Sequence, residues 1–197
     1  MKEYVETINL VPLQENDREQ FILDNQRAFK YGAQEEFGMR VERCEEGDEV
    51  ISRGTIERST DGEQAETYRI VLNGKIVGGL VLSIDKEAQK GELELLFVNP
   101  DVHSKGIGQA AWKAVERMHP EIHIWETITP YFEKRNIHFY VNRCGFQIVE
   151  FWNKHYHGPA IPEEEEGNWS EDDEMFLFRK IINNHSKSKG IKTEVTI

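Results

Sequence analysis

The sequence predicts an α+β (α/β) domain in which helices pack against one sheet, and three observations carry this prediction. Residues 91–110 (GELELLFVNPDVHSKGIGQA) show a buried-strand pattern, then a glycine-rich turn that opens an amphipathic helix. Asn73-Gly74 separates two strand patterns and is a strong hairpin signal, because both turn residues need a positive φ. A second amphipathic segment, residues 131–144, stops at Gly145, in the position of a helix C-terminal glycine.

The other predicted elements follow from hydrophobic spacing and from turn residues. A helix begins at Asn16 or Asp17, which can cap it, and carries apolar side chains from Phe21 to Phe29. Residues 31–47 are polar and predict a loop. The predicted strands cover residues 4–11, 67–72, 75–84, 93–98, 122–128, 146–152 and 175–182, and the remaining helices cover 50–59 and 106–118, the latter with Ile107, Ala111, Val115 and Met118 on one face.

Length and composition predict one cytoplasmic domain. The 197 residues are enough for a single domain over 1–183, followed by a flexible polar tail over 184–197. The first residues lack the basic and apolar pattern of a signal peptide, and no apolar stretch is long enough to span a membrane. Two cysteines, Cys44 and Cys144, are typical of a reducing compartment.

The charge of the chain is strongly negative. A net charge of −12 argues against a nucleic-acid partner, which would need a basic surface. Residues 163–174 (EEEEGNWSEDDE) hold eight carboxylates and no basic residue. This run has two interpretations: a solvated loop, or a negative rim that attracts a cationic substrate.

The glycine turn at 106–108 predicts a site for an anion. The first amides of a helix have no intrahelical partner, and the helix dipole favours negative charge there. Glycine lets a ligand approach the backbone closely. A phosphate-bearing ligand at the start of the helix near Gly106 is therefore expected.

Two motifs give the chain its family resemblance. The first is Val98-Asn99-Pro100 followed by Gly106-Ile107-Gly108, and the second, about 30 residues later, is Phe139-Tyr140 followed by Gly145-Phe146. Both lie on the expected elements and in the expected order, and the chain resembles the GNAT family of N-acyltransferases over roughly residues 66–152. It departs from the family at His103, where an Arg or Gln is usual.

The resemblance implies a mixed, mostly antiparallel sheet of six to seven strands with helices on both faces. It implies acetyl-CoA as cosubstrate. No metal is expected, because neither cysteine has metal-ligand spacing and no third ligand accompanies His155 and His157. The fourth and fifth strands would diverge, and the pantetheine arm would lie between them. The residues expected at the cosubstrate are Leu96, Phe97, Val98, His103, Ser104, Lys105, Gly106, Ile107, Gly108, Gln109 and Asn136. Asn136 is included because many members have an Asn that touches the coenzyme arm at the position of Glu133, and Asn136 is nearby, although out of register.

Three side chains are candidates for the chemistry. Glu92 and Glu94 are two apart on the strand that would reach the thioester, so they share a face, and either could take the proton of an ammonium group. An exposed, solvated strand face is the other interpretation of this pair. Tyr140 matches the position of a family tyrosine that protonates the leaving sulfur; it could instead only pack beside Phe139 and Phe146.

The resemblance also places the acceptor, between residues 29–37 and 152–174. An acidic, aromatic lining suits a primary amine that arrives as a cation, either a small molecule such as a polyamine or amino sugar, or a peptide amine. The expected lining residues are Tyr31, Glu35, Glu36, Trp152, Tyr156 and Trp169.

The predicted function is N-acetylation of a primary amine by direct attack in a ternary complex. The alternative is an acyl-CoA-binding or regulatory protein that keeps the fold without the chemistry; His103 and Glu133 favour it. A monomer or a homodimer is expected.

Overall fold

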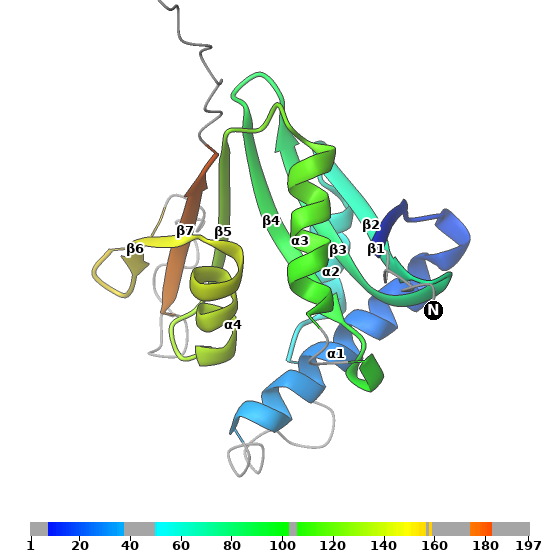
Figure 1. The fold of residues 1–197 in the computed structure, drawn as a ribbon. Coiled ribbons are helices and arrows are strands. Elements are labelled where there is room, and N and C mark those ends of the chain that lie inside the picture. Colours follow the sequence, from blue (N-terminus) through cyan, green and yellow to red (C-terminus); the bar gives the residue numbers. More distant parts are fainter. Residues whose placement is uncertain (1–7, 38–49, 103–105, 157, 159–173, 183–197) are drawn as a thin grey trace, which may run out of the picture.

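The computed structural model describes residues 8–37, 50–102, 106–156, 158 and 174–182, and the statements below refer to these residues. Its centre is one seven-stranded sheet in the order β1-β2-β3-β4-β5-β7-β6 (Figure 1). Neighbouring strands are antiparallel except for β4 and β5, which are parallel. The predicted fold class is therefore confirmed.

The first four strands form the antiparallel half of the sheet. Asn73 and Gly74 join β2 to β3 with φ angles of 50° and 79°, so the predicted hairpin is confirmed. Gly78 and Gly79 in β3 leave room for Phe97 of the next strand, because a Cβ on either glycine would clash with that residue. The four strands are β1 (Ile8–Pro12), β2 (Ala65–Leu72), β3 (Lys75–Asp85) and β4 (Lys90–Val98).

The other three strands extend the sheet beyond β4. The last strand in the sequence, β7, lies between β5 and β6 and is antiparallel to both, so β6 is an edge strand. These strands are β5 (Ile124–Pro130), β6 (Gln147–Trp152) and β7 (Met175–Ile181).

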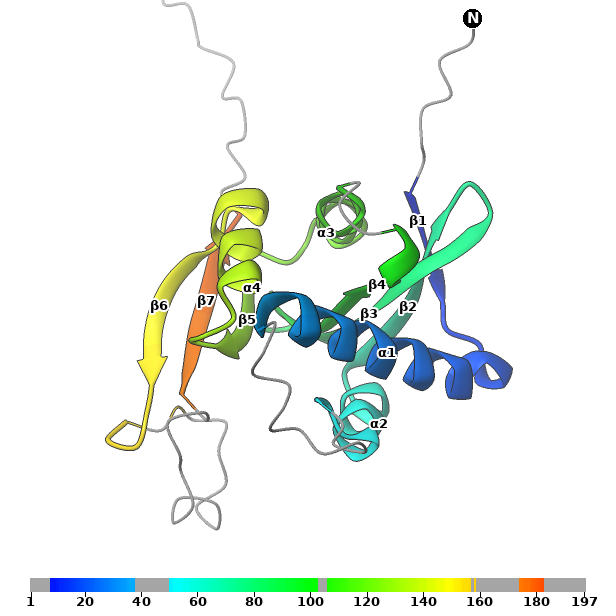
Figure 2. The ribbon, with the colours of Figure 1, turned by 90° about the horizontal axis from the view of Figure 1, so that it is seen from below.

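Helices cover both faces of the sheet, as Figure 2 shows. Helices α1 and α2 lie on one face, and α3 lies on the other with the π-helix η4. None of the described helices has the length and apolar content that crossing a membrane requires. The helices are α1 (Arg18–Phe37), α2 (Arg53–Asp61), α3 (Ile107–Met118), α4 (Lys134–His138) and η4 (Phe139–Cys144).

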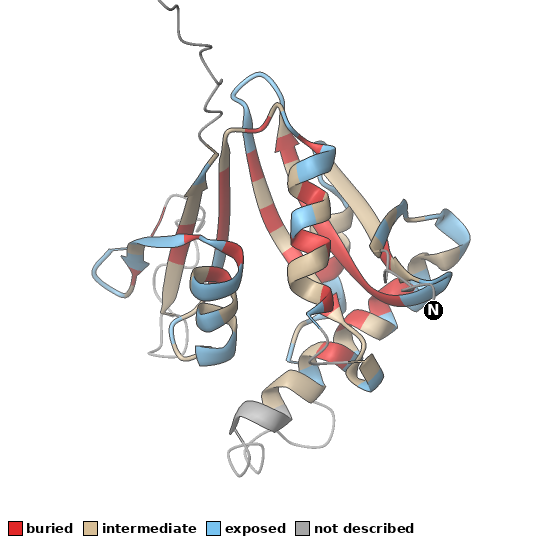
Figure 3. Cartoon of the chain, in the orientation of Figure 1, coloured by how far each residue is buried: buried red, intermediate tan, exposed pale blue. Residues whose placement is uncertain are grey.

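Each face of the sheet has its own hydrophobic core. Under α3 and η4, Trp112 meets Trp125 of β5 edge to face, with ring centroids 5.2 Å apart. Under α1 and α2, Phe21 meets Phe97 of β4 in the same way, also at 5.2 Å. Figure 3 shows that buried residues alternate with half-buried ones along β4. Strand β4 contributes to both cores, with Leu93 in the core under α3 and with Leu95 and Phe97 in the core under α1 and α2.

A bulge in β4 decides which side chains enter which core. Val81 pairs with Leu95 and Leu82 with Leu93, so Glu94 is an extra residue in the ladder. Leu93 consequently packs under α3, while Leu95 packs under α1 and α2. The same bulge leaves Glu94 on the α1–α2 side with Glu92.

The predicted boundaries of the first two helices are wrong. The helix predicted over residues 50–59 runs from Arg53 to Asp61, because Ser52 caps its first turn by accepting from the N–H of Thr55 (3.0 Å). Residues 31–37 were predicted as loop but continue α1 to Phe37. They lack the apolar stripe of the first part of the helix, but Ala, Gln and Glu are good helix formers. Residues 38–47 of that loop and residues 4–7 of the first predicted strand lie outside the described residues.

The helix predicted over residues 131–144 also differs from the structure. It begins at Lys134 instead of residue 131, because β5 runs to Pro130 and a turn follows in which the N–H of Glu133 donates to Pro130 O (3.1 Å). Its last six residues form a π-helix. Helix α3 has the predicted extent, but Met118 is 37% exposed and lies at the margin of the core.

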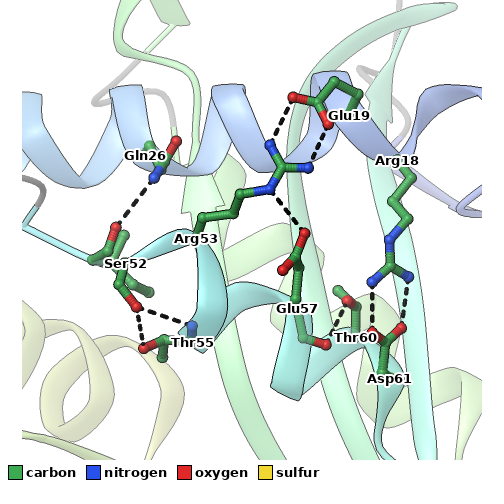
Figure 4. Close-up of polar contacts among 10 residues, drawn as sticks. Arg18, Glu19, Gln26, Ser52, Arg53, Thr55, Glu57, Thr60 and Asp61 are labelled. Carbon is green, nitrogen blue, oxygen red and sulfur yellow. Dashed lines mark hydrogen bonds and ion pairs between the residues drawn. The ribbon is translucent and has the colours of Figure 1, made fainter.

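Helices α1 and α2 also make polar contacts with each other, which Figure 4 shows. Arg53 of α2 donates to both carboxylate oxygens of Glu19 in α1 (2.8 and 2.6 Å) and to Glu57 in its own helix (2.8 Å). Exposed ion pairs of this kind contribute little to stability. The fully buried Ile56 contributes more to the position of α2.

A buried arginine joins α1 to the sheet. Arg69 of β2 is 3% exposed, and its guanidinium contacts the carboxylates of Asp17 (2.7 Å) and Asp24 (2.8 Å). The guanidinium also lies over the ring of Phe21, 5.2 Å from the centroid. A buried charge needs such partners, because burial without them would be very costly.

We predict that Arg69→Met lowers the free energy of unfolding by about 3 kcal/mol, because both carboxylates lose their partner. Urea unfolding at neutral pH measures the loss. The matched control is Arg53→Met, which removes the exposed arginine of α2 and leaves the unfolding midpoint near that of the wild type. Equal midpoints for wild type and both variants would contradict the prediction.

Candidate active site

The site is built around the divergence of β4 and β5. Their parallel ladder runs from Lys90 and Ile124 to Glu92 and Glu126, and the two strands then separate (Figure 1). The implied divergence of these strands is confirmed. Leu96, Phe97 and Val98, which were predicted to hold the pantetheine arm, lie on β4 beyond this point.

The two predicted base residues lie at the divergence, on the α1–α2 face. Glu92 belongs to the last ladder pair, and the Glu94 carboxylate accepts a hydrogen bond from Ser59 of α2. Burial raises the pKa of both carboxyls above the usual range of Glu. The Ser59 bond lowers the pKa of Glu94 but does not outweigh burial. Neither side chain is freely solvated, and each is poised to accept a proton nearer neutral pH.

A third carboxylate, Glu126, lies beside Glu92 and Glu94, but its pKa is shifted in the opposite direction. Burial would raise the pKa of Glu126, but hydrogen bonds from Lys90 and Arg179 outweigh it and hold the pKa below its usual range. The contacts are 2.6 Å from each partner. Glu126 therefore stays ionised. The charges of Glu126 and Glu94 raise the pKa of Glu92 further, whereas the charge of Lys90 lowers it.

Tyr140 approaches the divergence from the opposite face. The αL residue Gly145 (φ 80°) ends η4, and its N–H and that of Phe146 both donate to the carbonyl of Tyr140. The ring is 9% exposed and packs against Phe178 of β7 with centroids 5.4 Å apart. Burial raises the pKa of Tyr140 to about 12, although a hydrogen bond with Thr127 acts to lower it. The hydroxyl therefore keeps its proton at neutral pH.

The start of α3 has the backbone geometry of an anion site. Gly106 adopts φ 72°, a left-handed conformation that favours glycine. The N–H of Ala110 donates to Gly106 O (3.0 Å), so the amides of Ile107, Gly108 and Gln109 precede the first helical bond. His103, Ser104 and Lys105 lie outside the described residues.

The side chains near this turn have structural partners. A Cβ on Gly108 would lie 3.2 Å from the ring of Phe139, so this glycine allows α3 to pack closely against η4. The Gln109 amide donates to Arg143 O (2.6 Å). Asn136 donates to Thr129 Oγ1 (3.3 Å). The roles of Gly108, Gln109 and Asn136 at the cosubstrate stay predictions. For Gly108 and Gln109 the predicted contact is made by the backbone amide, which the side-chain partners leave unaffected.

The predicted acceptor residues are spread over two elements. Tyr31 is half-buried on α1, and Trp152 is buried at the end of β6. Trp152 Nε1 donates to Glu150 Oε2 (2.9 Å), and the exposed Tyr156 donates its hydroxyl to the same oxygen (3.1 Å). Their roles stay predictions. The side chains of Glu35 and Glu36, and all of Trp169, lie outside the described part of the chain.

Comparison with known proteins identifies the family. Residues 22–146 match the model of the Acetyltransferase (GNAT) family. The chain belongs to this family. It is 42% identical over 171 residues to the uncharacterized protein YrkN of Bacillus subtilis (strain 168). The matched region covers 85% of this chain and 90% of YrkN.

Solved structures of acetyltransferases share the fold. An acetyltransferase from Thermus thermophilus superposes with a TM-score of 0.61 at 15% identity, covering 89% of this chain and 97% of that one. A spermidine N-acetyltransferase from Vibrio cholerae in complex with CoA and spermine gives 0.60 at 11% identity, with 88% and 95% covered. PaiA N-acetyltransferase from Thermoplasma acidophilum in complex with coenzyme A gives 0.57 at 18%, with 89% and 99% covered.

Sequence reasoning missed two residues of the site, Glu126 and Thr127. Both are buried polar residues in β5, within the segment IHIWETI, which contains apolar and polar residues. A carboxylate inside a predicted central strand is a signal in itself, because a buried charge needs partners. Its partners Lys90 and Arg179 are far away in the sequence, so the pairing could not be read from spacing.

The raised pKa of Glu92 predicts how stability depends on pH. Because the folded protein holds this proton more tightly than the unfolded chain, stability falls as pH rises from the ordinary Glu value of about 4.3 through the raised value. Glu92→Gln removes this loss. The unfolding temperature of Glu92→Gln minus that of the wild type should therefore increase as the buffer is changed from acidic to neutral.

The matched control is Glu87→Gln, in the exposed turn between β3 and β4. It should follow the wild type at every pH. A constant difference between Glu92→Gln and the wild type across the pH range would show that Glu92 has no raised pKa.

Proposed function

We propose that this chain is an acetyl-CoA-dependent N-acetyltransferase that acetylates a cationic primary amine by direct attack in a ternary complex. One observation carries the proposal. Candidate bases, Glu92 and Glu94, and a candidate acid, Tyr140, reach the divergence of β4 and β5 from opposite faces of the sheet. A proton acceptor and a proton donor on the two sides of one opening suit acyl transfer from a thiol to an amine.

The residues present fit the cosubstrate, which supplies an activated acetyl thioester when bound. Gly106 leaves the approach to the helix start open, since no heavy atom lies within 4 Å of where its Cβ would be. The amides of Ile107, Gly108 and Gln109 and the positive end of the α3 dipole would hold the pyrophosphate. Backbone groups of β4 from Leu96 to Val98 would hold the pantetheine arm and face the thioester oxygen.

The proton balance of the reaction assigns the roles. The acceptor's ammonium group gives one proton to Glu92 or Glu94, and its nitrogen then forms a bond to the acetyl carbon. The bond between that carbon and sulfur breaks, and Tyr140 gives its proton to the sulfur. The nitrogen loses its second proton to solvent as the amide forms. Solvent then returns a proton to the phenolate and takes the proton from the carboxyl of Glu92 or Glu94, so both groups are restored and one proton is released overall.

The net charge of −12 supports a cationic acceptor. On the α1–α2 face, Glu92 and Glu94 are the candidate proton acceptors, whereas Lys90 and Arg179 neutralise the charge of Glu126. The fold neighbour from Vibrio cholerae was solved with spermine. A polyamine is therefore the first acceptor to test.

The test is an acceptor screen that follows release of free thiol from acetyl-CoA. The panel contains spermine, glucosamine and a peptide with a free amino terminus, and an aromatic amine that is neutral at neutral pH. Turnover is expected among the cationic amines. Turnover of the neutral amine alone would overturn the cationic acceptor, and calorimetric binding of acetyl-CoA without any turnover would favour the non-catalytic alternative.

Tyr140→Phe tests the acid in the same assay. The variant keeps the ring packing and removes the proton, so we expect kcat to fall roughly 100-fold while calorimetry shows unchanged acetyl-CoA binding. Tyr131→Phe, which removes a phenol hydroxyl from an exposed ring, is the control and should keep the wild-type kcat. A Tyr140→Phe variant with the wild-type kcat would remove Tyr140 from the mechanism.

Gly106→Ala tests the anion site. The left-handed φ of Gly106 strains a residue with a Cβ by about 1–2 kcal/mol, and relief of this strain would turn the first amides of α3. Acetyl-CoA should bind roughly tenfold more weakly in a calorimetric titration. The control is Gly74→Ala, which has the same strain (φ 79°) and equally open surroundings in the β2–β3 hairpin. Equal losses of affinity in both variants would contradict an anion site at Gly106.

A further inference from the structure

Thr127 occupies the first position beyond the ladder of β4 and β5. The last ladder pair is Glu92 with Glu126, and one residue further Thr127 Oγ1 donates to the carbonyl of Leu93 (2.8 Å). The side chain is 1% exposed. A side-chain hydroxyl thus replaces the next strand-to-strand bond and satisfies a buried carbonyl at the point where the strands separate.

Tyr140 lies beside this hydroxyl. Thr127 pairs across the strands with Phe178, and partners in an antiparallel ladder point to the same face. The Tyr140 ring packs on that same Phe178, with centroids 5.4 Å apart. The Thr127 hydroxyl therefore lies on the side of the sheet that carries Tyr140, and it acts to lower the pKa of the phenol against the larger raising effect of burial.

The number of protons fixes the direction of these bonds. A threonine hydroxyl has one proton and two lone pairs. Because Thr127 gives its proton to Leu93 O, which can only accept, a bond between the two hydroxyls has to be donated by the phenol. The protons thus allow one arrangement at rest, in which Tyr140 Oη–H donates to Thr127 Oγ1 and Thr127 Oγ1–H donates to Leu93 O.

We propose that Thr127 is a positioning residue for Tyr140, whose hydroxyl it orients at rest and whose phenolate it stabilises during the reaction. Once Tyr140 has given its proton to the leaving sulfur, Thr127 turns its own proton from Leu93 O to the phenolate oxygen. No proton is transferred from Thr127, and Leu93 O loses one hydrogen bond until the phenol is reprotonated. This inference rests on the proposed function, because it assumes that Tyr140 is the acid.

The experiment compares Thr127→Val, which keeps the shape and loses the hydroxyl, with Thr127→Ser, which keeps the hydroxyl. A hydrogen bond to a charged group predicts a fall in kcat of roughly 10-fold to 100-fold in Thr127→Val. The KM for acetyl-CoA should stay near the wild-type value, and Thr127→Ser should keep most of the rate. Acetyl-CoA and the fastest amine of the panel are the substrates, at a temperature where all variants are folded.

The double variant Tyr140→Phe/Thr127→Val separates positioning from structure. If Thr127 acts through Tyr140, the second substitution costs no further rate once the phenol is absent. An equal loss in both backgrounds, or a Thr127→Ser variant as slow as Thr127→Val, would overturn the inference while leaving Tyr140 as the acid. Wild-type rates for Tyr140→Phe itself would overturn the acid role and the inference together.

Discussion

The structure depends on where β4 stops bonding to β5. The two strands share a short ladder that ends at Glu92 and Glu126, and each then continues with its other neighbour, β3 or β7. Buried backbone groups need partners, so an opening inside a sheet is stable only if side chains or a ligand replace the missing bonds. Thr127 does this at the first position, and the pantetheine arm of acetyl-CoA would do so for the positions beyond it.

The bulge at Glu94 allows one strand to contribute to both cores and to carry the two candidate bases. Without it, strict alternation would place Leu93 and Leu95 on the same face. With it, Leu93 enters the core under α3, Leu95 enters the core under α1 and α2, and Glu92 and Glu94 stay together. Two carboxylates on one half-buried face destabilise the folded protein at neutral pH, a cost that is typical of functional sites.

Local signals in the sequence predicted the parts of the fold that depend on local chemistry. Asn73-Gly74 and Gly145 each require a positive φ, and the strand patterns beside them were placed within two or three residues. The bulge at Glu94, the partners of Glu126 and the bond from Thr127 to Leu93 depend on residues distant in the chain, and no spacing encodes them. Tyr140 was found through family resemblance, since its position in a π-helix has no signal in the sequence.

The close packing of Gly108 on Phe139 has a mechanical consequence. The first turn of α3 is joined to η4 by this contact and by the bond from Gln109 to Arg143 O (2.6 Å), and Lys180 bridges Glu116 of α3 and Cys144 O of η4 (2.5 Å each). These contacts tie the two helices together. A cosubstrate held at the start of α3, as proposed, would therefore also act on the segment that carries Tyr140, so that its binding and the position of the proposed acid would be energetically linked, and by reciprocity each would favour the other.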